Sequence, residues 1–360
     1  MGTTHHHPCG RRRRARVTRP AIVTLLCLYL VLPAGAQQSR PAGRQTSAPA
    51  ATLPLRARLA DYQRARQKAR AWLDRLEVDA AELVAHDVKG IKKLAEILYA
   101  YLSLYEHTDD PAEKAKIFLR VTRLALQVSR DEYHAILTGS DEVFHENSMS
   151  YLRVLHLLEQ FGLEMGAYRR RLAAIRPQMD AHLTKRGPWQ RAMFADYYDR
   201  FGLEKPAILR DTPTASGILA QRKPLAAFTI EAAYRLTHEV YVAYDYGMRR
   251  KQDRLTPEDI AYLRQLVPGL LRWSIQADNP DLAAELLSCM TYLGWHDYPI
   301  YTQAIGFLLD SQNANGSWGD YERLRPRVGK YVDQHAYLHT TMTATRALLD
   351  AFEGDWPTAE

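Results

Sequence analysis

The chain has 360 residues, of which 46% are hydrophobic and 25% are charged, and this ordinary globular composition suffices for one large domain or two smaller ones. Its net charge of +7 would favour a polyanion such as nucleic acid, but the excess is confined to the first 36 residues. That segment holds six arginines and no acidic residue, and without it 42 basic residues face 41 acidic ones. The rest of the chain is nearly neutral, and we expect no nucleic-acid partner.

Residues 1–36 have the layout of a signal peptide. Their arginines precede an apolar run over residues 21–32, and the small residues Ala34-Gly35-Ala36 follow it. Because the apolar run is short for a bilayer span, we expect cleavage after Ala36, with an uncleaved anchor as the alternative. Residues 37–54, rich in Ala, Pro, Ser, Gln and Arg, are expected to form a flexible linker. The sequence predicts an exported protein, periplasmic or secreted, with no membrane span after signal removal.

Cysteine usage leaves one thiol for the exported protein. Cys9 and Cys27 both lie in the predicted signal peptide, and Cys289 is the third cysteine of the sequence. No intramolecular disulfide is then expected. A single thiol in an oxidising compartment is either buried and inert or used as a ligand or nucleophile.

Beyond residue 54, apolar residues recur with the 3.6-residue period of a helix, and almost no segment alternates with the two-residue period of a strand. The breaks coincide with turn and cap signals such as Gly187-Pro188 and Asn279-Pro280. In chain order, helices are predicted over residues 57–76, 94–104, 110–129, 142–163, 166–184, 189–201, 224–243, 256–276, 279–294, 298–312 and 333–352. We therefore predict an all-α protein.

Short connections between these helices favour antiparallel helix hairpins, packed either into a closed α/α toroid or into an open helical solenoid. The sequence shows no strict repeat of 34 to 47 residues, which favours the toroid over the solenoid. A proline-containing connection at residues 203–223 marks an approximate boundary. We expect an N-terminal helical region over residues 55–222 and a C-terminal, toroid-like region over residues 223–360.

The segment over residues 304–320 ends a helix with Gln312, continues through Asn315-Gly316 and reaches Trp318. It resembles the Gln-Trp motif of the terpenoid cyclase and protein prenyltransferase superfamily, and the resemblance extends over about residues 225–352. It implies an α/α toroid, in which the glutamine and tryptophan tighten a turn between helices. The Asp-x-Asp-Asp motif with which squalene-type cyclases protonate their substrate is absent, so we do not expect that reaction.

The side chains that could carry chemistry lie on three predicted helices: His238 and Asp245 seven residues apart, then Asp281, Glu285 and Cys289 at intervals of four, and finally His339. Helices of a toroid converge on a central funnel, where one polar side chain from each helix can meet the others. A thiolate with imidazole nitrogens is a borderline-soft ligand set suited to zinc, with copper as the less favoured metal. We therefore predict a metal site formed by these helices.

The predicted metal ligands are His238, Cys289 and His339, with Asp245 or Glu285 as the general base of a zinc-dependent hydrolase or transferase. The resemblance to protein prenyltransferases, which hold zinc with one Asp, one Cys and one His, implies the same roles for Cys289 and His339. The position two residues before the cysteine, where that family has its Asp, is Leu287 here. For this reason His238 is predicted as the third ligand.

Other interpretations stay open. Cys289 lies in an apolar run and can be a small core residue, while the histidines can serve ordinary packing roles. The chain contains 21 tyrosines, and a funnel lined by aromatic rings would suit a small molecule, a peptide or a glycan. One alternative is therefore a non-catalytic exported protein that binds a peptide, glycan or protein partner. Another is an (α/α)-barrel carbohydrate-active enzyme, with Glu285 paired to Asp245 or Asp333.

Overall fold

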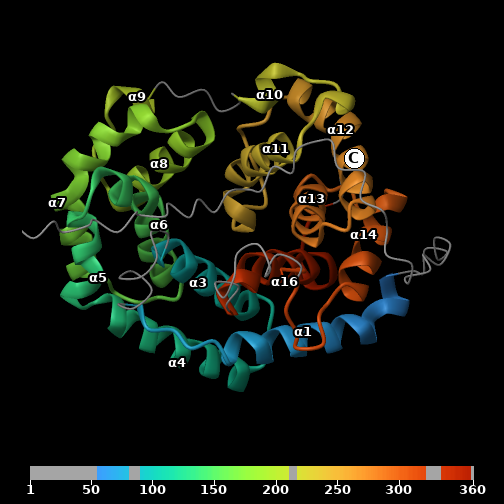
Figure 1. Cartoon of the computed structure of the whole chain (residues 1–360), viewed down its shortest axis with the longest axis horizontal. Helices are drawn as coiled ribbons and strands as arrows, with labels where there is room; N and C mark the ends of the chain where they lie inside the picture. Colours follow the sequence, from blue (N-terminus) through green and yellow to red (C-terminus); the bar gives the residue numbers. More distant parts are fainter. Residues whose placement is uncertain (1–54, 81–89, 211–216, 322–333, 358–360) are drawn as a thin grey trace, which may run out of the picture. The chain divides into compact units, whose positions relative to one another are not determined.

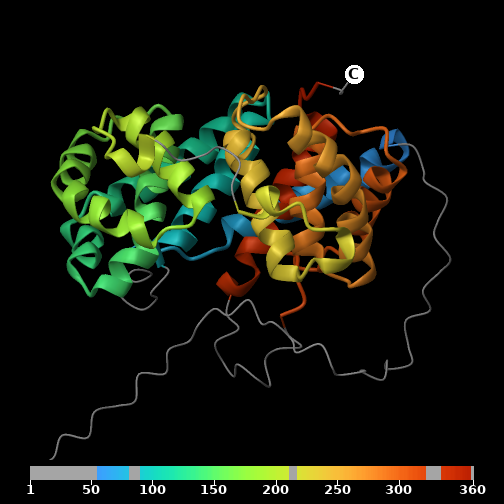
Figure 2. The same cartoon turned by 90° about the horizontal axis from the view of Figure 1, so that it is seen from above.

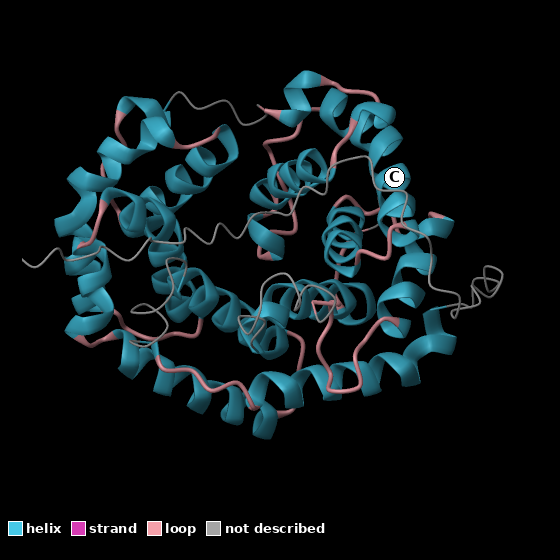
Figure 3. Cartoon of the chain, in the orientation of Figure 1, coloured by secondary structure: helices cyan, strands magenta, loops and turns pink. Residues whose placement is uncertain are grey.

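The computed structural model of the chain describes residues 55–80, 90–210, 217–321 and 334–357. Every regular element within these ranges is an α-helix or a 3-10 helix, and none of these residues is in a β-strand (Figure 3). The prediction of an all-α protein is confirmed. The predicted signal peptide (residues 1–36), the predicted linker (residues 37–54) and Asp333 lie outside the described residues.

The long helices follow the predicted pattern closely. They are α1 (Leu59–Asp74), α3 (Gly90–Glu106), α4 (Pro111–Val128), α6 (Asp141–Gln160), α7 (Gly166–His182), α8 (Pro188–Phe201), α11 (Ile230–Ala243), α12 (Pro257–Gln276), α13 (Pro280–Tyr292), α14 (Pro299–Asp310) and α16 (Leu338–Glu353). The shorter elements are η1 (Leu55–Arg58), α5 (Asp131–Ala135), η2 (Ile136–Thr138), η3 (Leu183–Lys185), α9 (Ala207–Arg210), α10 (Ile218–Gln221), η4 (Leu225–Ala227), η5 (Asp245–Gly247) and η8 (Gln334–Tyr337).

Three local predictions differ from the structure. The expected connection at residues 203–223 contains the short helices α9 and α10. The helix expected over residues 224–243 begins only at Ile230, because Thr229 is extended and its hydroxyl accepts a hydrogen bond from the N–H of Ala232. The last long helix begins at Leu338, after the 3-10 turn η8, rather than at residue 333.

Side-chain caps explain why several helices begin where the sequence signals them. Asp110 accepts a hydrogen bond from the N–H of Ala112 ahead of α4, and Asn279 accepts one from Leu282 ahead of α13. Both helices also carry proline at their first position, where no N–H is needed. A cap of this kind contributes about 1 kcal/mol to helix stability.

Helices α3, α13 and α16 form the centre of the packing. Helix α16 packs against both α3 and α13, α3 packs on α6, and α13 also contacts α11, α12 and α14. In Figures 1 and 2 the helices α5 to α9 lie on one side of α3, and α11 to α14 lie on the other. Every residue of α13 from Leu282 to Tyr292 is buried. These contacts confirm helix-on-helix packing, while closure into an α/α toroid stays a prediction.

The segment with the Gln-Trp pattern follows α14 in the chain and forms hydrogen bonds to both α14 and α1. The side-chain amide of Gln312 donates to the carbonyl oxygens of Ala65 and Gly316, at 2.9 and 3.0 Å. Trp318 is 1% exposed, and its ring N–H donates at 2.7 Å to a carbonyl in the last turn of α14. Gly316 has φ of +98°, and a Cβ there would lie 2.3 Å from the carbonyl oxygen of Lys68. The segment therefore has a structural role.

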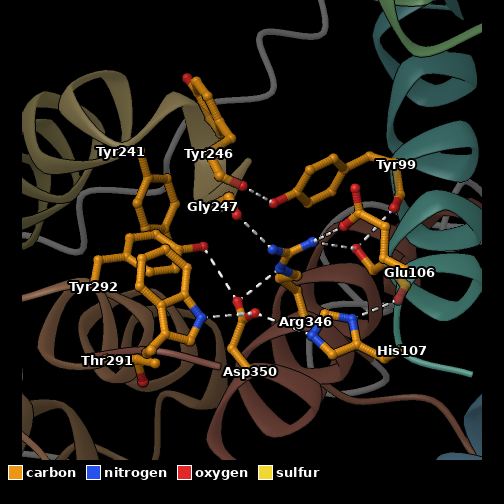
Figure 4. Close-up of polar contacts among 12 residues, drawn as sticks. Tyr99, Glu106, His107, Tyr241, Tyr246, Gly247, Thr291, Tyr292, Arg346 and Asp350 are labelled. Carbon is orange, nitrogen blue, oxygen red and sulfur yellow. Dashed lines mark hydrogen bonds and ion pairs between the residues drawn. The ribbon is translucent and has the colours of Figure 1, made fainter. Parts of the chain in front are cut away.

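A buried arginine on α16 connects three parts of the core (Figure 4). The side chain of Arg346 is 3% exposed, and its Nε donates to Asp350 Oδ2 at 2.6 Å. Its two terminal nitrogens donate to Glu106 Oε2 at 3.0 Å and to the carbonyl oxygen of Gly247 at 2.9 Å. Helix α16 is thereby tied to the end of α3 and to the turn that follows α11.

In the described part of the chain, no helix combines the length and the apolar character needed to cross a lipid bilayer.

Candidate metal centre

Two acids of α13 and one histidine of α16 meet between the two helices. Asp281 and Glu285 are one turn apart on α13, and His339 is the second residue of α16. One ligand atom from each of the three residues can be chosen so that all lie within 4.8 Å of one another. Glu285 is buried, whereas Asp281 and His339 are partly exposed, so the group is partly accessible to solvent.

The two nitrogens of the His339 ring have different partners. Nδ1 lies 2.8 Å from Oε1 of Glu96, a buried residue of α3. Nε2 lies 3.4 Å from Glu285 Oε1 and 3.8 Å from Asp281 Oδ2. A histidine that binds a metal through one nitrogen usually donates its other N–H to a carboxylate, which fixes the ring. Glu96 stands in that position relative to His339.

The spacing of these atoms suits a small cation. Two ligands bonded at about 2.1 Å with tetrahedral angles are about 3.4 Å apart. The distances from Nε2 to the two carboxylate oxygens, 3.4 and 3.8 Å, are close to this value. The three side chains can therefore hold a divalent cation with small adjustments of their torsion angles.

Hydroxyl groups hold both carboxylates of α13 in place. The hydroxyl of Thr237 donates to Glu285 Oε2 at 2.5 Å. Tyr234 and Thr343 donate to the two oxygens of Asp281, at 2.9 and 3.1 Å. The carboxylates are thus oriented from α11 and α16 before any ligand binds.

The charges of His339 and the neighbouring acids shift one another's pKa values. Burial alone would lower the pKa of His339, but Asp281, Glu96 and Glu285 outweigh it and raise this pKa well above its ordinary value. Burial alone would raise the pKa of Glu285, but His339, His238 and Thr237 lower it instead. Likewise the pKa of Glu96 falls to about 2, despite burial, because of Lys92 and His339. Without a cation, the positive charge of a protonated His339 compensates the negative charges of the acids. A bound cation would supply this positive charge instead, and His339 would lose its proton.

His238 lies at the edge of the group with a fixed ring orientation. Its Nδ1 is 2.6 Å from the carbonyl oxygen of Tyr234, so the proton is assigned to this nitrogen and Nε2 carries a lone pair. Burial lowers the pKa of His238, more than Glu285 and the Tyr234 carbonyl raise it. The ring packs on Trp189 with a centroid distance of 4.8 Å, and Nδ1 is 4.0 Å from Glu285 Oε2. His238 is a neutral base beside the acids.

Cys289 is not part of the group. The residue is 1% exposed, and its sulfur lies 3.9 Å from the carbonyl oxygen of Thr237. Burial, with a contribution from Glu285, raises the pKa of the thiol well above its ordinary value. A metal ligand must be the thiolate, and this environment disfavours it. The geometry therefore gives the prediction of Cys289 as a ligand no support.

Asp245 serves elsewhere. It forms an ion pair with Arg200 of α8, and it opens the turn η5 with φ of +50°. The described group of possible ligands contains Glu285 but not Asp245. Of the predicted site residues, His339 and Glu285 are in this group and His238 borders it.

Two residues of the site had no predicted role. Asp281 is on the same helix face as Glu285, four residues before it. The sequence distinguishes Asp281 from Glu285 only by its position in the first turn of α13. Glu96 stands in a helix whose neighbouring positions are apolar, such as Leu94 and Ile97, and all three are buried. An acid on the apolar side of a helix is unusual and needs a partner, and this signal could have identified Glu96.

The comparisons with known proteins give a family without an assigned activity. The family described as Domain of unknown function (DUF6895) matches residues 62–348, a range that includes every residue of the candidate metal centre. No curated protein and no solved structure matches the chain. Since the match spans most of the sequence, the chain belongs to the DUF6895 family.

Proposed function

We propose that this protein is a metal-dependent hydrolase or group-transfer enzyme whose divalent cation is held by Asp281, Glu285 and His339. The observation that carries the proposal is the position of His339 between Glu96 on one side and the two carboxylates of α13 on the other. Buried or half-buried acids are costly to maintain, and a cation compensates them more fully than a single imidazolium does.

Zinc is the metal that we propose for the site. One imidazole and two carboxylates form a three-ligand set that leaves a coordination position for water or substrate, as in catalytic zinc sites. Copper(II) would prefer a square arrangement richer in nitrogen, which the described residues of this group do not offer.

The surrounding side chains suggest a separate role in the reaction for each of them. A cation at this position would polarise a carbonyl or phosphoryl oxygen, or lower the pKa of a bound water. His238, which borders the group and has a lowered pKa, is the residue that we propose to accept the proton of the attacking water. Glu96 would orient His339, and Thr237 would orient Glu285. The predicted signal peptide supports a reaction outside the cytoplasm.

The test is elemental analysis of the purified full chain, followed by calorimetric titration of chelator-treated protein with Zn²⁺. We expect about one zinc per chain in the wild type and in Cys289→Ser, which is the matched control. His339→Ala and Asp281→Asn should bind at least about tenfold more weakly while keeping the helical circular dichroism of the wild type. A wild-type protein that binds no Zn²⁺ would contradict the proposal and favour the non-catalytic binding protein.

A further inference from the structure

Arg153 on α6 is a charged side chain in cation–π contact with two tyrosine rings. Its guanidinium carbon lies 4.3 Å from the ring centroid of Tyr246 and 4.9 Å from that of Tyr99. The residue is partly buried. Both distances are within the range of a cation–π interaction, which stabilises the guanidinium charge and restrains the side chain.

The N–H donors of Arg153 have no hydrogen-bond acceptor in the part of the chain that the structure describes. Among the described residues, no carboxylate or carbonyl oxygen accepts a hydrogen bond from Arg153, whereas Arg346 and Arg200 both have carboxylate partners. The acid that interacts with Arg153 electrostatically, Glu96, already has His339 and Lys92 as partners. A partly desolvated, immobilised guanidinium without an acceptor is suited to bind an anionic oxygen group through its planar fork.

A strained turn places the Tyr246 ring on Arg153. Asp245 and Tyr246 have φ of +50° and +54°, which side-chain-bearing residues rarely adopt, and Gly247 follows at +84°. Three contacts hold the turn. Arg200 pairs with Asp245. The Tyr99 hydroxyl donates to the carbonyl oxygen of Tyr246, and Arg346 donates to that of Gly247 (Figure 4). Strain maintained by so many contacts is typical of functional sites.

Arg153 adjoins the candidate metal centre. The Tyr246 ring that covers it packs against the Tyr241 ring, with a centroid distance of 5.5 Å. The hydroxyl of Tyr241 donates at 3.1 Å to the carbonyl oxygen of Glu285. On the other side, Glu96 links Arg153 electrostatically to His339. Arg153 therefore lies within electrostatic range of Glu96, the acid that contacts His339.

We propose that Arg153, in cation–π contact with Tyr99 and Tyr246, binds an anionic oxygen group of the substrate, a carboxylate or a phosphate, next to the candidate metal centre. The substrate role rests on the proposed function, but anion binding by Arg153 does not depend on it. The substrates of the enzyme are then acids or phosphorylated compounds, anchored by their charge at Arg153 while the bond to be cleaved lies at the acids and histidines.

The test is calorimetric titration of the full chain at constant ionic strength with two probes, succinate and inorganic phosphate. Both are titrated into metal-free protein, and succinate also into protein supplied with one equivalent of Zn²⁺. The variants are Arg153→Gln and Arg153→Lys. The matched control is Arg264→Gln, because Arg264 also packs on an aromatic ring, that of Trp295, at 5.7 Å but is exposed.

We expect at least one probe to bind the wild type and Arg264→Gln equally, and to bind Arg153→Gln about tenfold or more weakly. Arg153→Lys should lose part of the affinity, because an ammonium cannot replace the planar fork. The proposal is overturned if neither probe binds in any arm or if Arg153→Gln binds as the wild type does. The probe that binds distinguishes a carboxylate from a phosphate ligand.

Two further measurements separate this proposal from the metal proposal and from misfolding. Arg153→Gln should bind Zn²⁺ as the wild type does, and Asp281→Asn should keep its anion affinity. If the protein binds an anion at Arg153 but binds no zinc, the proposal for Arg153 stands and the metal proposal is contradicted. If both Arg153 variants unfold, phenylglyoxal labelling of wild-type protein decides: bound anion must protect Arg153 and not Arg264, and equal labelling with and without anion overturns the proposal.

Discussion

The side chain of His339 connects Glu96, an acid 243 positions earlier in the chain, to the carboxylates of α13: Nδ1 lies 2.8 Å from Glu96, and Nε2 faces Glu285 at 3.4 Å. The orientation of the ring therefore depends on a helix that contributes no ligand of its own. Its effect on metal binding can be measured separately from that of the ligands.

Glu96→Gln should weaken zinc binding by about ten- to a hundredfold, because a neutral amide orients His339 less firmly and makes its Nε2 less basic. The matched control is Glu159→Gln, which changes a glutamate that pairs with Arg169 at the surface. Calorimetric titration with Zn²⁺ measures both. An unchanged affinity in Glu96→Gln would show that Glu96 does not support a metal ligand.

Arg346→Met should destabilise the fold by about 3–5 kcal/mol, because it leaves Asp350 and Glu106 without their buried partner. Arg235→Ala, at an exposed ion pair with Glu231, should change the free energy of unfolding by less than about 1 kcal/mol. Urea denaturation followed by circular dichroism gives both values. Similar small losses in the two variants would mean that the buried network contributes little net stability.

The protein should lose stability as the pH falls below about 6.5, the ordinary pKa of histidine. His156 accepts a hydrogen bond from Arg200 at 3.3 Å and must be neutral, and burial together with Arg200 and Arg153 lowers its pKa to about 3. Between these two values the unfolded state binds a proton that the folded state does not. The free energy of unfolding then falls with decreasing pH, by up to about 1.4 kcal/mol per pH unit for this residue.

His156→Gln should reduce this dependence while His134, whose pKa burial lowers to about 4, continues to contribute. Thermal unfolding of the wild type and the variant from pH 7 to pH 4 measures the two slopes. Equal slopes would contradict the assignment of a neutral His156.

Gly316→Ala should cost more than about 1 kcal/mol, because alanine is strained at φ of +98° and its Cβ would meet the Lys68 carbonyl oxygen at 2.3 Å. Gly306→Ala is the matched control within α14, where the nearest atom to a new Cβ is 3.9 Å away. It should raise stability by about 0.5–1 kcal/mol, since alanine favours a helix. Melting temperatures of the two variants should therefore shift in opposite directions.

The sequence predicts the helices because the apolar period of 3.6 residues and the capping residues are local signals, each contained within a few neighbouring positions. The first turn of α13, with Asn279 as cap and Pro280 next to it, shows both signals and is placed within one residue. The difference at residue 224 has a local cause as well: Thr229 offers a better cap than any residue near Pro224, whose own side chain makes no capping bond.

The site is predicted only in part because its members come from distant helices. Glu285 and His339 could be named from residue type and spacing, but which oxygen faces which nitrogen depends on how α13 packs on α16. Glu96 has no local sign of its partner beyond its apolar surroundings. The chemistry of a thiolate favours Cys289 as a ligand, whereas the structure buries the thiol beside a carbonyl oxygen.

The contacts of α1 have a consequence for the order of folding. This helix comes early in the chain, yet Gln312 binds its Ala65 carbonyl, and its Tyr62 stacks on Phe352 with a centroid distance of 4.2 Å. These two partners are synthesised roughly 250 to 290 residues later, and contacts of such large sequence separation slow folding. While the chain is being made, α1 can already contact Tyr101 of α3, but the part of its apolar face that packs on α14 and α16 stays uncovered and prone to aggregation. Full stability is reached only when α16 has been added.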